Sequence, residues 1–271
     1  MEYAMINVAD YIIKFLQERG VKYAFQVTGG GAMFLNDAVE KSNIKPIFCH
    51  HEQSCAMAAV GYTKVTNEPS LVIPTSGCGS TNTITGILDA WQDSHPVIVV
   101  SGQANKKDTT YLSSLPLRKL GVQEVNIIEI VKSITKFSTM ITEPEDVAII
   151  MEKAFHIATS GRQGPVWIDV PLDVQNSIID EERLAHWSNE DIEDNEDGVS
   201  EFEAFLKNSK RPVVIAGNGI NSADARKEFV EFVEKYNLPC TFTFLATDLL
   251  DAEHPLYIGR LGIKGTRAGN F

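Results

Sequence analysis

The fold of this chain is decided by a short run in which a strand gives way to a helix, Lys45-Pro46-Ile47-Phe48-Cys49-His50-His51-Glu52-Gln53-Ser54-Cys55-Ala56. Residues 45–49 predict the strand, and residues 52–65 predict the helix that follows it. Glu52 is therefore expected at a strand end, in the first turn of a helix. The same change from strand to helix recurs further along the chain, in Thr75-Ser76-Gly77-Cys78-Gly79-Ser80-Thr81-Asn82.

Strands and helices alternate on both sides of this run. Strands are expected at residues 23–27, 45–49, 71–74, 97–101, 134–137 and 166–170. Helices are expected at residues 8–19, 33–39, 52–65, 81–92 and 145–159. The strand at 97–101 is apolar in the manner of strands that are buried on both faces. This repeating order predicts an α/β fold with a doubly wound parallel sheet covered by helices on both sides.

The composition shifts after this first domain. Residues 1–180 are expected to form it, and the acidic stretch 181–198 is expected to be a solvated linker. A new β-α unit starts in residues 199–271, with strands at 212–216 and 240–244 and helices at 200–206 and 223–236. No closing element is expected at its end, so the second domain reads as an incomplete Rossmann-like domain.

Length and charge exclude several classes of protein. The chain has 271 residues, of which 44% are hydrophobic and 22% charged, which is typical of a globular protein. No apolar run reaches the ~18 residues of a membrane span. A net charge of −12 argues against nucleic acid and anionic lipid as partners. The polar N-terminus does not read as a secretory signal, and a cytoplasmic location is expected.

Three other readings of these residues stay open at this point. The cysteines Cys49, Cys55, Cys78 and Cys240 form no CxxC pair, so reduced, buried thiols are favoured over a zinc site. The turn at 77–82 partly fits a dinucleotide fingerprint, but its third glycine position holds Asn82. Glu52 could simply stabilise the helix start, by about 0.3–1 kcal/mol. Its neighbours Phe48 and Cys55 are instead expected to desolvate the carboxyl, which suits acid–base chemistry.

Several segments of the chain occur together in one order and spacing. They are Gly30-Gly31-Ala32, His51-Glu52-Gln53, Thr75-Ser76-Gly77-x-Gly79-x-x-Asn82, Asp89-Ala90-x-x-Asp93-Ser94-x-Pro96, Gly102-Gln103, Val122-Gln123-Glu124 and Gly161-Arg162-x-Gly164-Pro165-Val166. With this set the chain resembles the thiamine diphosphate-dependent enzymes of the acetolactate synthase type, over nearly its whole length. The resemblance implies that residues 1–180 are the pyrimidine-binding (Pyr) domain and that residues 199–271 are part of the central domain.

The resemblance also implies roles for particular residues. In the family, the residue at the position of Glu52 hydrogen-bonds a ring nitrogen of the cofactor and helps to remove its C2 proton, so Glu52 is the expected catalytic residue. The expected cofactor-binding residues are Gly30, Gly31, Glu52, Thr75, Gly79, Asn82 and Arg162. Arg162 stands where flavin-containing members contact FAD. Gly31 and Gln123 stand where the family lines its substrate pocket.

No metal ligand is expected in this chain. The family holds Mg²⁺ and the diphosphate with a Gly-Asp-Gly segment of a C-terminal domain, and no Gly-Asp-Gly occurs in the 271 residues. The chain is therefore expected to be inactive alone. By the resemblance it is a homodimer or homotetramer, or it binds a partner chain that carries the diphosphate-binding domain.

The expected function is that of a thiamine diphosphate-dependent decarboxylase or carboligase acting on a 2-oxo acid, with FAD as a possible second cofactor. The sequence departs from the family in several segments, including Gly29-Gly30-Gly31-Ala32 for its usual Pro-Gly-Gly-Ala. The 2-oxo acid, the acceptor and the pathway therefore stay open. Two alternatives also stay open: a noncatalytic subunit or fragment, and a flavin- or nucleotide-binding oxidoreductase without thiamine chemistry.

Overall fold

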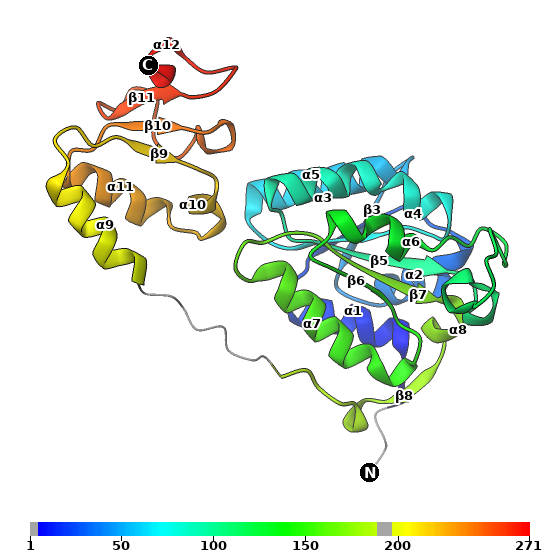
Figure 1. Ribbon diagram of the computed structural model, residues 1–271. Helices are drawn as coiled ribbons and strands as arrows, with labels where there is room; N and C mark the ends of the chain where they lie inside the picture. The colour runs from blue at the N-terminus through cyan, green and yellow to red at the C-terminus, as the bar shows by residue number, and fades with distance from the viewer. Residues whose placement is uncertain (1–4, 189–196) are drawn as a thin grey trace. The chain divides into compact units, whose positions relative to one another are not determined.

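The computed structural model describes residues 5–188 and 197–271 and divides the chain into two compact units, residues 1–188 and 189–271 (Figure 1). Residues 189–196 of the linker expected at 181–198 lie outside the described residues. Its first part is ordered, because a short 3₁₀ helix, η6 (Glu181–Arg183), belongs to unit 1. No described helix is long and apolar enough to cross a membrane.

Unit 1 is built around a six-stranded sheet in the order β3-β2-β4-β5-β7-β6, and every neighbouring pair is parallel. Its strands are β2 (Tyr23–Gln26), β3 (Lys45–Phe48), β4 (Ser70–Ile73), β5 (Val97–Gln103), β6 (Phe137–Met140) and β7 (Val166–Pro171). A separate antiparallel pair joins β1 (Met5–Asn7) to β8 (Ile178–Asp180). The parallel α/β sheet predicted from the sequence is confirmed.

Helices cover both faces of this sheet. They are α1 (Val8–Glu18), α2 (Met33–Glu40), α3 (Glu52–Thr66), α4 (Cys78–Asn82), α5 (Ile84–Asp93), α6 (Ile127–Val131), α7 (Val147–Thr159) and α8 (Leu172–Gln175). Helices α1, α2 and α7 pack with one face of the sheet in a single apolar cluster, and α3, α5 and α6 pack with the other (Figure 1). All seven residues of β5 are buried, as expected for a central strand between two helical layers.

The strand order places a topological switch point between β2 and β4. The chain runs outward from β2 to β3, then returns to the other side of β2 as β4. Parallel sheets bind ligands in the crevice outside the carboxyl ends of the strands at such a point. The segments that follow β2, β3 and β4 therefore define where a site is expected.

Two predicted elements of unit 1 differ from the structure, and one pair of strands was not predicted. The helix expected at 81–92 is two helices, because the chain breaks at Thr83, whose hydroxyl donates to the Ser80 carbonyl oxygen at 2.6 Å. The strand expected at 134–137 lies further on, at β6, and a 3₁₀ turn, η4 (Lys132–Ile134), occupies its predicted start. The pairing of β1 with β8 carries no sequence signal, since each strand has only three residues.

Unit 2 holds a three-stranded parallel sheet in the order β11-β10-β9. Its elements are α9 (Asp197–Asn208), β9 (Val214–Ala216), α10 (Gly219–Ser222), α11 (Arg226–Lys235), β10 (Cys240–Phe242), β11 (Tyr257–Arg260) and α12 (Arg267–Asn270). This sheet agrees with the α/β fold expected for residues 199–271, and their description as part of a central domain stays a prediction. Helix α12 packs on β11, and the Gly259 carbonyl and Gly269 carbonyl both accept from the Thr241 hydroxyl.

Candidate functional site

Two segments meet directly at the switch point. The backbone N–H of Gly31, in the 3₁₀ turn after β2, donates to Thr75 Oγ1 after β4 at 3.1 Å. A Cβ added at Gly29 would stand 2.5 Å from Thr75 Cβ, and one at Gly31 would stand 2.7 Å from Ser76 Oγ. These two glycines therefore allow the two turns to close on each other. Gly30 has open space where a Cβ would stand, so packing alone does not require a glycine there.

Glu52 lies at the same edge, at the first residue of α3. Its Oε2 accepts a hydrogen bond from Asn82 Nδ2 at 3.0 Å, which ties the turn after β3 to the helix after β4. The preceding residue caps the helix, since His51 Nδ1 accepts from the Gln53 N–H. The sequence thus brings together an acid and an amide that lie 30 residues apart.

The surroundings of the Glu52 carboxyl are more open than expected. Glu52 is only half-buried, and Phe48 is 61% exposed, because β3 is an edge strand whose end faces outward. The expected desolvation by Phe48 is therefore wrong, although Cys55 is buried. A Cβ at Gly79 would stand 2.7 Å from Thr75 Cγ2 and 3.5 Å from Glu52 Oε1. Gly79 accordingly keeps space free beside this carboxylate oxygen.

Gln123 also reaches this edge. It follows β5 through a long segment and adopts a left-handed backbone with φ +56°. Its carbonyl oxygen lies against Gly77, where an added Cβ would stand 2.4 Å from it. Gly77 itself has φ +62°, so the contact needs glycine both for its conformation and for its lack of a side chain.

Arg162 is not brought to this group. It precedes β7 and lies at the amino edge of the sheet, where its Nε donates to Ser94 Oγ at 2.8 Å. It lines a separate pocket of about 330 Å³ with Trp91, Gln92, Lys136 and Gln163. The residues expected to bind cofactors thus divide between opposite edges of the sheet: six lie at the carboxyl edge, and Arg162, which was expected to contact FAD, lies at the other.

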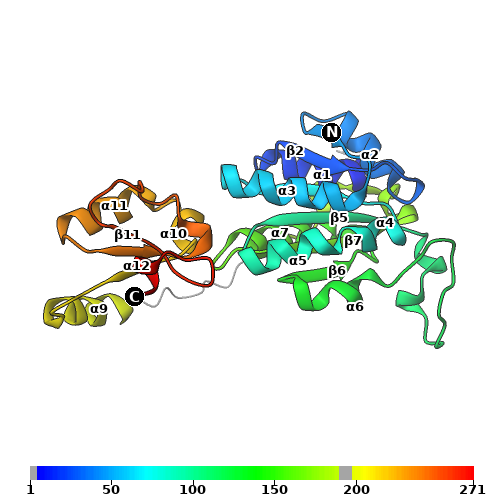
Figure 2. The same cartoon turned by 90° about the horizontal axis from the view of Figure 1, so that it is seen from above.

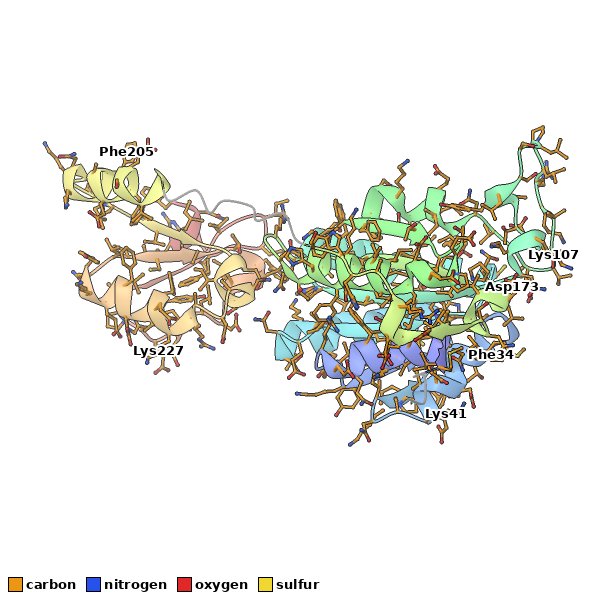
Figure 3. The ribbon with its side chains drawn as sticks, turned by 90° about the horizontal axis from the view of Figure 1, so that it is seen from below. Phe34, Lys41, Lys107, Asp173, Phe205 and Lys227 are labelled. Atoms are coloured by element: carbon orange, nitrogen blue, oxygen red, sulfur yellow. The ribbon has the colours of Figure 1, made fainter. Side chains whose placement is uncertain are left out.

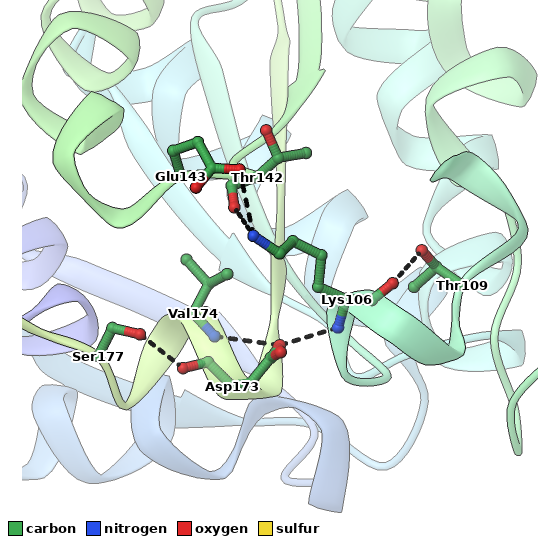
Figure 4. Close-up of polar contacts among 7 residues, drawn as sticks. All are labelled: Lys106, Thr109, Thr142, Glu143, Asp173, Val174 and Ser177. Atoms are coloured by element: carbon green, nitrogen blue, oxygen red, sulfur yellow. Dashed lines mark hydrogen bonds and ion pairs between the residues drawn. The ribbon is translucent and has the colours of Figure 1, made fainter. Parts of the chain in front are cut away.

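The segment 104–126, between β5 and α6, is anchored where it leaves the sheet (Figure 4). The Lys106 N–H donates to Asp173 Oδ1 at 2.8 Å, and Lys106 Nζ donates to the Thr142 carbonyl oxygen at 2.8 Å and pairs with Glu143 at 3.1 Å. Lys106 therefore connects the segments that follow β5, β6 and β7. Lys107 and Asp173 mark this end of unit 1 in Figure 3, and Figure 2 shows the segment projecting beyond the end of β5.

A buried polar network lies behind this segment, and the sequence reasoning did not find it. Asp169 of β7 is fully buried and accepts from Ser101 Oγ at 2.5 Å and Gln103 Nε2 at 2.9 Å. Trp167 Nε1 donates to the same Ser101 hydroxyl at 2.8 Å. Burial raises the pKa of Asp169 to about 7, against the opposing effect of the two hydrogen bonds. A single acid inside an otherwise apolar strand was the available signal.

The buried carboxyl should give unfolding a distinct pH dependence. Folded Asp169 keeps its proton up to about pH 7, whereas the unfolded chain releases it near the ordinary value of 3.8. The contribution of Asp169 to the free energy of unfolding is therefore greatest at low pH, falls as pH rises toward 7 and is constant above it. Asp169→Asn should remove this component, so the difference from wild type should change between pH 4 and 7. Urea unfolding followed by tryptophan fluorescence would measure it, and parallel profiles would contradict it.

The alternative metal reading gains no support. No cluster of three or more potential ligands that could hold a metal ion occurs in residues 5–188 and 197–271. All four cysteines are free; Cys55 and Cys240 are buried as expected, whereas Cys49 is partly buried and Cys78 is exposed. Burial, and contact with Cys49, raise the pKa of the Cys55 thiol to about 12, which makes it a poor thiolate ligand.

Comparison with known proteins identifies the family to which this chain is similar. Residues 6–130 match the family model described as thiamine pyrophosphate enzyme, N-terminal TPP binding domain, and residues 199–271 match the model for the central domain of the same enzymes. The chain is 33% identical over 266 residues to the acetolactate synthase isozyme 2 large subunit of Escherichia coli, a match of 98% of this chain and 47% of that relative. It is 36% identical over 269 residues to the acetolactate synthase large subunit of Lactococcus lactis, a match of 97% of this chain and 45% of the relative.

The chain belongs to the thiamine pyrophosphate enzymes. Its two matched regions are acetolactate synthase-like, and the expected family is confirmed. The chain spans about half the length of the curated relatives it matches.

Proposed function

We propose that this chain supplies the pyrimidine-activating half of a thiamine diphosphate-dependent 2-oxo acid decarboxylase or carboligase of the acetolactate synthase type. The observation that carries the proposal is the Glu52–Asn82 contact at the switch point, with one carboxylate oxygen held and space beside the other. A carboxylate that is oriented but accessible suits proton exchange with a bound ring.

The residues at this edge fit the aminopyrimidine end of the cofactor. The Glu52 carboxylate would exchange a proton with a ring nitrogen, while the Asn82 amide keeps Oε2 in place. The absence of a side chain at Gly79 would let the ring approach Oε1. When bound, thiamine diphosphate supplies the carbon nucleophile that attacks a 2-oxo acid. Gly30, Gly31 and Thr75 complete the proposed cofactor-binding group, and Gly31 with Gln123 would face the substrate.

The remaining assignments extend this proposal. Residues 1–180 would be the pyrimidine-binding domain, 181–198 the linker and 199–271 part of the central domain. Arg162, at the opposite edge, would contact FAD if this protein binds it. The active form would be a homodimer or homotetramer, or a complex with a chain that holds Mg²⁺ and the diphosphate. A cytoplasmic location fits the four free cysteines.

The isolated chain should bind thiamine diphosphate weakly, with no tight Mg²⁺-dependent component. Mg²⁺ bound to a diphosphate needs one or two fixed carboxylates in octahedral geometry. The family supplies them from a Gly-Asp-Gly segment, and none occurs in the 271 residues. Calorimetric titration of the chain, with and without a candidate partner that carries the diphosphate-binding domain, measures this directly.

The titration separates the proposal from its alternatives. Tight Mg²⁺-dependent binding that appears only with the partner supports the proposed function. Micromolar binding and carbon dioxide release from pyruvate by the chain alone would contradict the assignment of the diphosphate site. If thiamine diphosphate binds neither to the chain alone nor to the chain with its partner, the result would favour a noncatalytic subunit.

A further inference from the structure

The side-chain amide of Gln103 connects the central sheet to the segment that carries Gln123. Gln103 is the last residue of β5, and only 1% of it is exposed. Its Nε2 donates both to Asp169 Oδ2 at 2.9 Å and to the Val125 carbonyl oxygen at 2.8 Å. Its Oε1 accepts from the Ala104 N–H at 2.9 Å. All the hydrogen-bonding groups of this amide are engaged, so its orientation is fixed.

The Val125 carbonyl lies only two residues beyond Gln123. Between them Glu124 is buried, and its carboxylate accepts from the N–H groups of Thr110 and Leu120. The Gln123 carbonyl is pressed against Gly77. Three groups thus hold the backbone at 123–125. Of these three, the Gln103 amide is the one that belongs to a strand of the sheet.

Asp169 determines how strongly Gln103 is held. An ionised carboxylate accepts a shorter and stronger hydrogen bond than a neutral acid does. The charged or titratable side chains on the helices packed against β7 are Glu129 of α6, Glu152, Lys153 and His156 of α7 and Asp173 of α8. None of them contributes to the pKa shift of Asp169, and strands β5 and β6 carry no such group. Asp169 is therefore the group in this network whose charge changes with pH.

We propose that Gln103 is a positioning residue which, supported by Asp169, holds the backbone at Val125 and so fixes where Gln123 is presented at the carboxyl edge. The positioning of the Val125 backbone by Gln103 involves only residues of this chain. The consequence for substrate binding rests on the function proposed above.

The first test is hydrogen–deuterium exchange of the full chain, followed by peptide mass spectrometry. Gln103→Met keeps a similar volume but removes the donor. In the peptide covering residues 119–126, the Leu120 amide, which donates to Glu124, should then exchange at least ~10-fold faster. Trp167→Phe is the matched control, because it removes a hydrogen bond on the Ser101 side of Asp169 and leaves the Gln103–Val125 bond in place. It should leave exchange of this peptide unchanged, and the β4 peptide should keep its wild-type rate in both variants.

A pH series adds a readout that loss of packing would not give. After correction for intrinsic exchange, wild-type protection of residues 119–126 should increase as pH rises through about 7, where Asp169 ionises. Asp169→Asn keeps the size of the side chain and should remove this dependence. A pH-dependent profile that survives in the variant would overturn the role given to Asp169.

The exchange results test the positioning role of Gln103 without a measurement of enzyme activity. Equal exchange in wild type and Gln103→Met would overturn it, and so would equally faster exchange throughout the sheet.

The link to substrate is tested in an assembly that turns over pyruvate. There Gln103→Met should raise KM for pyruvate at least ~10-fold and change kcat by less than ~3-fold. An unchanged KM would overturn the link, whereas an inactive wild-type assembly would refute the proposed function and leave the exchange result standing.

Discussion

Glu52→Gln should reduce turnover by at least ~10²-fold in an assembly that contains the diphosphate-binding domain, the low end for loss of a general acid–base group. The variant has the same shape, and its amide oxygen can still accept from Asn82 Nδ2. The fold should therefore be preserved while the proton-exchanging group is lost. Steady-state turnover of pyruvate measures the effect, and tryptophan-monitored unfolding confirms that unit 1 remains intact.

Glu68→Gln provides the matched control for this measurement. Glu68 is the same residue type and accepts from Lys22 and Tyr62 on the surface of unit 1. It should leave turnover within about twofold of wild type, since its ion pair is solvent-exposed and remote from the carboxyl edge. Near-normal turnover in the Glu52 variant would refute the assignment of Glu52.

Gly102→Ala should destabilise unit 1 by about 3 kcal/mol, at the upper end of the cost of overpacking a core. An added Cβ at Gly102 would stand 2.1 Å from the Gly31 carbonyl oxygen and 2.6 Å from the Ala32 backbone nitrogen. Both obstacles are backbone atoms, so no side-chain rotation can relieve the contact. The 3₁₀ turn after β2 must shift, and the Gly31–Thr75 hydrogen bond shifts with it.

Gly61→Ala adds the same methyl group where there is space. Gly61 lies inside α3, and nothing stands within 4 Å of its added Cβ. This variant should stabilise unit 1 by about 0.5–1 kcal/mol, because alanine favours the helix. Urea unfolding followed by fluorescence reports on unit 1 alone, since Trp91, Trp167 and Trp187 all lie in it. Equal stability of the Gly102 variant and wild type would contradict the packing argument.

The sequence predicted the elements that have strong periodicity and failed where structure depends on distant partners. The strands at β2, β3, β4, β5 and β7 were predicted because each is an apolar run bounded by turns. The pair β1–β8 was missed, since strands of three residues are defined only by their pairing. The break at Thr83 was also missed, because it depends on one side-chain hydrogen bond inside a helical pattern.

The candidate site shows the same division. Glu52 was singled out from its place at a strand end, but its contact with Asn82 depends on the strand order, which periodicity does not give. The expected role of Phe48 was wrong because edge strands leave one side open, and the sequence does not show which strand is at the edge. Asp169 and Gln103 were missed as a pair because they lie 66 residues apart.

The two anchors of the segment 104–126 also determine which part of it can vary in sequence. Lys106 fixes its start, and the Gln103–Val125 bond fixes its end. Between them, the exposed apolar side chains Leu112, Leu115, Leu117, Leu120 and Val122 contribute little to the core. The length and the side chains of the stretch between the anchors can therefore change, or be replaced by those of a relative, without altering its two points of attachment to the sheet.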